Sequence, residues 1–126
     1  MLNKILDDFE RIIVKLEEVL KLEKTDIIRD SAVKRFELCF DLAWKAIKVF
    51  AQESGITCFS PKECFKTAFQ LKLIDYEEKW LEMIADRNLF VRLYKEETAY
   101  KLYSKLFEYA KMFKDLLTKL EEKEKG

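Results

Sequence analysis

Residues 25–55 read TDIIRDSAVKRFELCFDLAWKAIKVFAQESG, and this stretch decides the fold class. Thr25 and Asp26 are residue types that favour the N-terminus of a helix, and Gly55 is the type that favours its end. Between them, apolar residues recur at alternating three- and four-residue steps, the spacing of one face of an α-helix. They are Val33, Phe36, Phe40, Ala43, Ile47 and Phe50. The stretch therefore predicts a long helix, the longest in the chain and central to the fold.

The flanking segments show the same periodicity. Residues 2–20 carry one apolar stripe, and residues from about 96 onward carry two neighbouring apolar rows before the charged tail EEKEKG. SPKE at 60–63 places Ser before Pro and Glu three residues after the Ser, which predicts the capped start of a short helix. DYEE at 75–78 repeats the pattern and predicts a fourth helix, capped by Asp75 and extending to about Val91.

Short connections between amphipathic helices predict an all-α fold, an antiparallel up-and-down four-helix bundle with an additional short helix. We expect residues 1–126 to form a single domain, since the length is about that of one domain. With only 2 Gly and 1 Pro, the chain has few places to turn, as in helical bundles. Leu38, Trp44 and Val49 lie off the main stripe of residues 25–55, so spare apolar surface predicts a homodimer.

Composition excludes several functional classes. The 24 Lys and Arg residues balance 24 Asp and Glu residues, so no overall charge draws the chain to nucleic acid or to an acidic membrane. With no His, three Cys and no CxxC pair, neither a zinc site nor a disulfide framework is indicated, and we expect no cofactor or metal. The N-terminus lacks the apolar run of a signal peptide, and no stretch approaches the roughly 20 residues of a membrane span. We therefore expect a soluble, cytoplasmic protein.

The segment IADRNLFVRLYKEE, residues 84–97, contains polar residues where the helical spacing calls for core residues. Arg87 follows Ile84 and precedes Val91 on one row, and a buried guanidinium requires a carboxylate partner. Glu37 and Asp41, one turn apart on the preceding long helix, are the predicted partners. From spacing alone, Arg87 is either a structural ion pair that reaches solvent or part of a functional polar cluster.

Three segments resemble a known family. RDSAVKRFELCFDLAWKAIK (29–48), SPKECFKTAF (60–69) and WLEMIADRNLFVRLYKEETA (80–99) are similar, in this order, to the helical substrate-binding subunits of two-component nucleotidyltransferases, within the wider HEPN class. The resemblance implies a four-helix bundle, a homodimer and a minimal nucleotidyltransferase protein as partner. Many such pairs resemble toxin–antitoxin modules, in which the HEPN protein is an RNase and the partner neutralises it by adding AMP to a tyrosine.

The toxin members carry Arg, four residues, His, one residue and Tyr. Arg87 matches that Arg, Asn88 the residue that usually follows it, and Tyr94 the tyrosine, whereas Arg92 stands at the histidine position. An arginine, whose pKa exceeds about 12, is a poor general acid or base, although it holds phosphate well. We expect a bend after Val91 that brings Arg87 and Arg92 to one cleft.

The first hypothesis is a non-catalytic substrate-binding and adaptor subunit that docks a nucleotidyltransferase and presents a polar cleft for a nucleotide, an RNA or another phosphate-bearing ligand. Its candidate binding residues are Arg87, Asn88, Arg92, Tyr94, Glu37 and Asp41. The second is a HEPN-type RNase toxin of a toxin–antitoxin module, with Arg87 and Asn88 as candidate catalytic residues and Tyr94 as the site of AMP addition. The third is a purely structural bundle.

Overall fold

The computed structural model describes residues 2–125, and every regular element in this part of the chain is an α-helix. The helices are α1 (Leu2–Leu20), α2 (Asp26–Glu53), α3 (Pro61–Gln70), α4 (Glu77–Leu93) and α5 (Glu96–Lys125). None of them combines the length and the apolar character that crossing a membrane requires. The predicted all-α class is confirmed.

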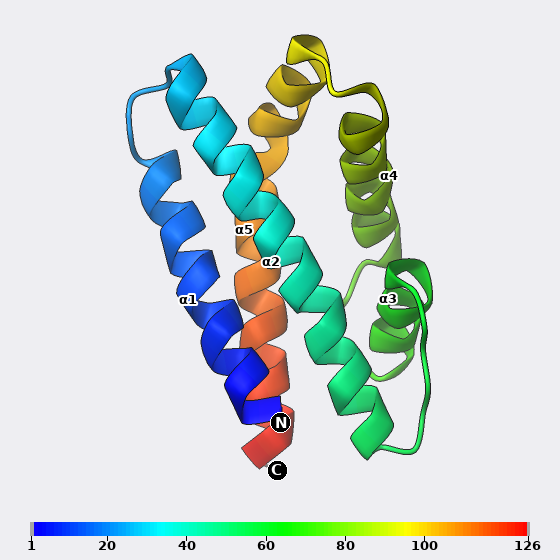
Figure 1. Ribbon diagram of the computed structural model, residues 1–126. Helices are drawn as coiled ribbons and strands as arrows, with labels where there is room; N and C mark the ends of the chain where they lie inside the picture. The colour runs from blue at the N-terminus through cyan, green and yellow to red at the C-terminus, as the bar shows by residue number, and fades with distance from the viewer. Residues whose placement is uncertain (1, 126) are drawn as a thin grey trace.

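The helices form an up-and-down bundle (Figure 1). α1, α2 and α5 run side by side. α4 packs on α3 and α5 and is the fourth helix of the bundle. α2 contacts α1, α3 and α5, in agreement with its predicted central place. It is not the longest helix, however, because α5 has 30 residues and α2 has 28.

Two predicted helix starts are correct. The Thr25 side chain accepts a hydrogen bond from the Ile28 amide at 3.1 Å and caps α2. The Ser60 side chain accepts one from the Glu63 amide at 3.2 Å and caps α3, with Pro61 in the first turn. Past the other end of α2, Gly55 has a φ of 82°, which a residue without a Cβ adopts readily.

The predicted Asp75 cap is wrong. α4 begins at Glu77 after Tyr76, whose side chain makes no capping hydrogen bond. Leu73 and Ile74 are buried in the core, so the chain is anchored just before Asp75 and enters the helix one residue later than predicted. α4 also continues past Val91 to Leu93. A left-handed residue, Tyr94 with φ 48°, then ends it.

Packed aromatic rings fill the centre of the bundle. The Phe36 ring lies 5.9 Å from that of Phe113 and 5.7 Å from that of Tyr109, joining α2 to α5. The Trp80 ring of α4 lies 5.8 Å from Phe113 and 4.7 Å from Phe65 of α3. Edge-to-face and offset contacts of this kind add to the stabilisation from burial, so one aromatic cluster links four helices.

Cys58 and Cys64 form a disulfide, contrary to the expectation from their spacing. The chain before α3 turns back at the Ser60 cap, which brings the two Cα atoms to 5.2 Å, within the range that a disulfide spans. Cys39 is free and buried, and burial raises the pKa of its thiol, so it behaves as a small core residue.

Candidate functional site

Arg87 is held by an aromatic ring and not by a carboxylate. Its guanidinium carbon lies 5.2 Å from the centroid of the Phe40 ring on α2, and its Nη1 donates to Asn88 Oδ1 at 3.2 Å. Within residues 2–125 it forms no ion pair, so the predicted salt bridge to Glu37 or Asp41 is wrong. The side chain is half-buried, and an electron-rich ring face attracts its guanidinium, but within residues 2–125 its buried Nε has no hydrogen-bond partner.

Asp86, the residue before it, faces α5. Its Oδ2 accepts from the Tyr109 hydroxyl at 2.5 Å and from Lys105 Nζ at 2.9 Å, and Lys105 also reaches Glu82 at 3.0 Å. The hydrogen bonds to Asp86 and Glu82 raise the pKa of Lys105, and burial together with the Asp86 carboxylate raises the pKa of Tyr109. These contacts fix the rotation of α4 about its own axis relative to α5. They therefore also fix the direction in which the Arg87 side chain points.

Arg92 does not join Arg87. α4 is continuous through both residues, without the expected bend after Val91, and five positions along a helix correspond to about 140° of rotation. Arg92 and Asn88 are exposed, and Asp41 is half-buried on α2. The expectation that both guanidiniums reach one cleft is therefore wrong for this structure.

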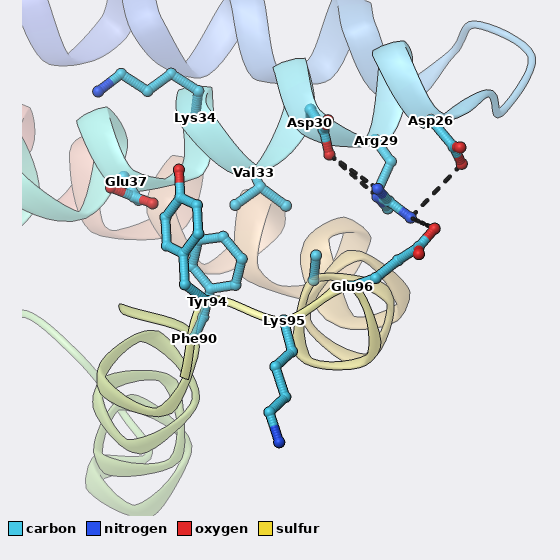
Figure 2. A pocket seen from close by; sticks show the side chains of 11 residues that line it. Asp26, Arg29, Asp30, Val33, Lys34, Glu37, Phe90, Tyr94, Lys95 and Glu96 are labelled. Atoms are coloured by element: carbon cyan, nitrogen blue, oxygen red, sulfur yellow. Dashed lines mark hydrogen bonds and ion pairs between the residues drawn. The ribbon is translucent and has the colours of Figure 1, made fainter. Parts of the chain in front are cut away.

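Tyr94 and Glu37, in contrast, lie at one site. They line a groove of about 480 Å³ between the first half of α2 and the turn that joins α4 to α5. Its walls combine apolar and charged side chains from three helices and the turn (Figure 2). The lining residues are Asp26, Arg29, Asp30, Val33, Lys34, Glu37, Phe90, Tyr94, Lys95, Glu96 and Ala99.

Tyr94 forms the aromatic wall of this groove. Its amide donates to the Phe90 carbonyl at 2.8 Å, and its ring lies 5.4 Å from the Phe90 ring. A left-handed backbone is unusual for a bulky residue, and such conformations concentrate at functional sites. The side chain is 80% exposed, and in Figure 2 its hydroxyl end points toward α2. The ring face is thus open to a ligand.

Arg29 closes the other end of the groove. It is only 6% exposed, and its guanidinium contacts Asp30 at 3.1 Å, Glu96 at 3.3 Å and Asp26 at 3.6 Å. Burial disfavours its charge, but the hydrogen bonds with Asp30 and Glu96 outweigh this and raise its pKa. Sequence reasoning missed Arg29, although it precedes the buried Val33 by four residues, the same signal that singled out Arg87.

The arrangement is suited to binding. Within residues 2–125, no group of His, Cys, Asp and Glu residues is placed to hold a metal ion. The groove is open to solvent and offers an aromatic face, carboxylates and an apolar floor, which are the elements of a ligand site. The geometry defines the class of protein as a helical bundle with an open, mixed-polarity groove at one end.

Comparison with known proteins gives the family. The chain belongs to the family described as nucleotidyltransferase substrate binding protein like, whose model matches residues 4–122. It is similar to a crystal structure of a protein from Thermus thermophilus, with a TM-score of 0.82 and 31% identity over 89% of this chain and 98% of that one. A comparison with curated proteins gave no match.

A second similar structure comes from Haemophilus influenzae and is described as revealing the fold of a substrate binding domain of a nucleotidyltransferase. It matches with a TM-score of 0.69 and 20% identity over 95% of this chain and 96% of that one. At this identity, the likeness shows that the two proteins share a fold.

Proposed function

We propose that the protein is the non-catalytic substrate-binding subunit of a two-component nucleotidyltransferase, acting beside a minimal nucleotidyltransferase protein that carries the nucleotide. The match of the family model over residues 4–122 is the observation that carries this proposal. The groove supports it, because Tyr94 and Glu37 line an open site of a size typical for small ligands.

The other candidate residues have a place in this proposal. Asn88 and Arg92 are exposed on α4, and Arg87 and Asp41 are half-buried on α4 and α2. We assign this surface to contacts with the partner or with a nucleotide or RNA, because each arginine is able to grip a phosphate separately. A cytoplasmic homodimer, with the exposed apolar side chains of α2 and α4 at its interface, completes the proposal.

The test is complex formation with a minimal nucleotidyltransferase protein. The two purified proteins are mixed and examined by size-exclusion chromatography with light scattering, which also gives the oligomeric state of the chain alone. We expect co-elution in a defined ratio and a dimer of the isolated chain. Failure of an active, folded nucleotidyltransferase to bind overturns the adaptor role, and a monomer at high micromolar concentration overturns the dimer.

A second candidate function is an RNase toxin neutralised by AMP addition at Tyr94. The exposure of this side chain, 80%, favours an acceptor role. In such a reaction the Tyr94 oxygen bonds to the α-phosphorus of ATP, the bond to the β-phosphate breaks, pyrophosphate leaves and the phenolic proton passes to solvent. Intact mass spectrometry after incubation with partner, ATP and magnesium should then show AMP on the parent protein and none on Tyr94→Phe.

RNase activity is the discriminating measurement between the two functions. Arg92 stands where proton transfer would require a histidine, and a positioned general acid or base typically contributes about a hundred- to ten-thousandfold in rate. We therefore expect no appreciable RNA cleavage by the purified protein. Cleavage that is abolished in Arg87→Ala would favour the toxin over the adaptor.

A further inference from the structure

The interior of the groove carries an excess of negative charge. Around Arg29, three carboxylates face one guanidinium, so the cluster keeps a net negative charge. Glu37 adds another carboxylate that forms no ion pair within residues 2–125. Lys34 and Lys95 belong to the rim, and in Figure 2 both extend away from the Arg29 cluster. Counting these two lysines, the groove lining has four carboxylates and three cationic side chains, so its net charge stays negative.

The wall opposite α2 is aromatic, which is an observation independent of the charges. The Phe90 and Tyr94 rings lie 5.4 Å apart at a 33° angle, and Phe90 is buried beneath the exposed Tyr94. Val33 and Ala99 complete an apolar floor. An exposed tyrosine ring face attracts an ammonium or guanidinium group through its quadrupole, and the Glu37 carboxylate, unpaired within the described residues, lines the same groove.

An anionic ligand fits this groove poorly. Arg29, its one buried cation, already has its donors directed at Asp26, Asp30 and Glu96, so it offers no free charge to a phosphate. The volume of about 480 Å³ lies within the range of roughly 300–1,000 Å³ for small-molecule sites. The groove thus has the size of a small-molecule site, and its lining favours a positively charged group over a phosphate.

We infer that the groove binds a small organic cation, a molecule with an amine or guanidine group that lies on the Tyr94 ring and pairs with Glu37. The inference rests on the proposed function for its biological meaning, because it names the chemical class of the substrate that this subunit presents. In this arrangement the phosphates of the nucleotide are bound outside the groove, by the partner and by the arginines of α4.

The experiment titrates agmatine, spermidine and AMP separately into the isolated protein, followed by NMR with ¹³C-labelled tyrosine and by calorimetry. Agmatine and spermidine should shift the Tyr94 ring signals and bind more weakly as salt is added, whereas AMP should leave these signals unchanged. Tyr94→Ala should weaken cation binding about fivefold to tenfold, and Tyr94→Phe, which keeps the ring, should retain most of it.

Glu37→Gln tests the carboxylate, and Glu53→Gln, an exposed change at the end of the same helix, is its matched control. We expect about a tenfold loss for Glu37→Gln and none for Glu53→Gln. Equal binding by all variants, no binding of either cation, or binding of AMP on Tyr94 would overturn the inference. Each variant is also tested for co-elution with the nucleotidyltransferase. If the parent protein co-elutes with the nucleotidyltransferase but binds no cation, this inference alone is refuted. If the parent protein does not co-elute, the proposed function is refuted.

Discussion

The hydrogen bond between Tyr109 and Asp86 gives the sharpest test of how α4 is held. Tyr109 is only 1% exposed, and its hydroxyl donates to Asp86 Oδ2 at 2.5 Å across the α4–α5 interface. Tyr109→Phe removes the hydroxyl and leaves the ring, so its stacking on Phe36 at 5.7 Å is kept and no cavity of ring size is created.

The magnitude follows from the charge of the acceptor. A hydrogen bond to a charged group contributes about 1.5–3 kcal/mol, and Asp86 retains Lys105 as a second partner. The Asp86 side chain is 24% exposed, so water replaces the lost donor only in part. We therefore expect Tyr109→Phe to lower the free energy of unfolding by about 1.5–3 kcal/mol near neutral pH.

The pH dependence has a definite sign. Burial and Asp86 raise the pKa of Tyr109, so above about pH 10 the unfolded chain has released a proton that the folded one still holds. Stability from this group is complete below that pH and is lost as the pH rises. Lys105, whose pKa is also raised, contributes in the same direction. Tyr109→Phe should hence show a smaller loss of stability between about pH 9 and 11 than the parent.

Urea unfolding followed by circular dichroism measures both effects. Tyr94→Phe is the control, because it removes a hydroxyl from a side chain that is 80% exposed and should change stability by less than about 0.5 kcal/mol. If Tyr109→Phe is as stable as this control at neutral pH, or if its alkaline profile matches the parent's, the proposed anchoring of α4 through Asp86 is refuted.

Three further predictions concern the remaining contacts. Reduction of the Cys58–Cys64 disulfide, whose partners are six positions apart, should lower stability by about 2 kcal/mol, measured by urea unfolding with and without reductant. Ser60→Ala should cost about 1 kcal/mol through the lost α3 cap, visible as a lower midpoint in the same assay. Arg29→Met should cost about 1–3 kcal/mol, because three carboxylates lose their counter-charge, and added salt should recover part of it; a variant insensitive to salt would contradict this.

The helices were predictable because their signals are local. Apolar spacing and the Ser60 cap act within one or two turns, so they hold whatever surrounds them. Asp75 begins the same four-residue pattern as Ser60 but does not cap a helix, because the burial of Leu73 and Ile74 decides where the chain enters α4. The disulfide was missed for a similar reason, since spacing alone does not show that the chain turns back between Cys58 and Cys64.

The partner of Arg87 was not predictable from spacing, because it depends on the rotation of α4. Lys105 and Tyr109 of α5 hold Asp86 on one side of the helix. The next residue is rotated by about 100°, and this brings Arg87 over Phe40. Helical periodicity identified the row correctly, whereas the contact across to α2 was set by side chains on a third helix.

The placement of the motif separates the two functional hypotheses. Arg87 and Tyr94 are seven positions apart, which is about 10 Å along a helix, and only Tyr94 lines the groove. A small molecule on the Tyr94 ring therefore need not contact Arg87. In the RNase hypothesis, the RNA has to contact both Arg87 and Tyr94. Only a ligand that extends beyond the groove, such as an RNA strand, reaches both residues. Loss of small-cation binding in Tyr94→Ala but not in Arg87→Ala would thus point to a subunit that presents its ligand in the groove, independently of Arg87 at the other end of the motif.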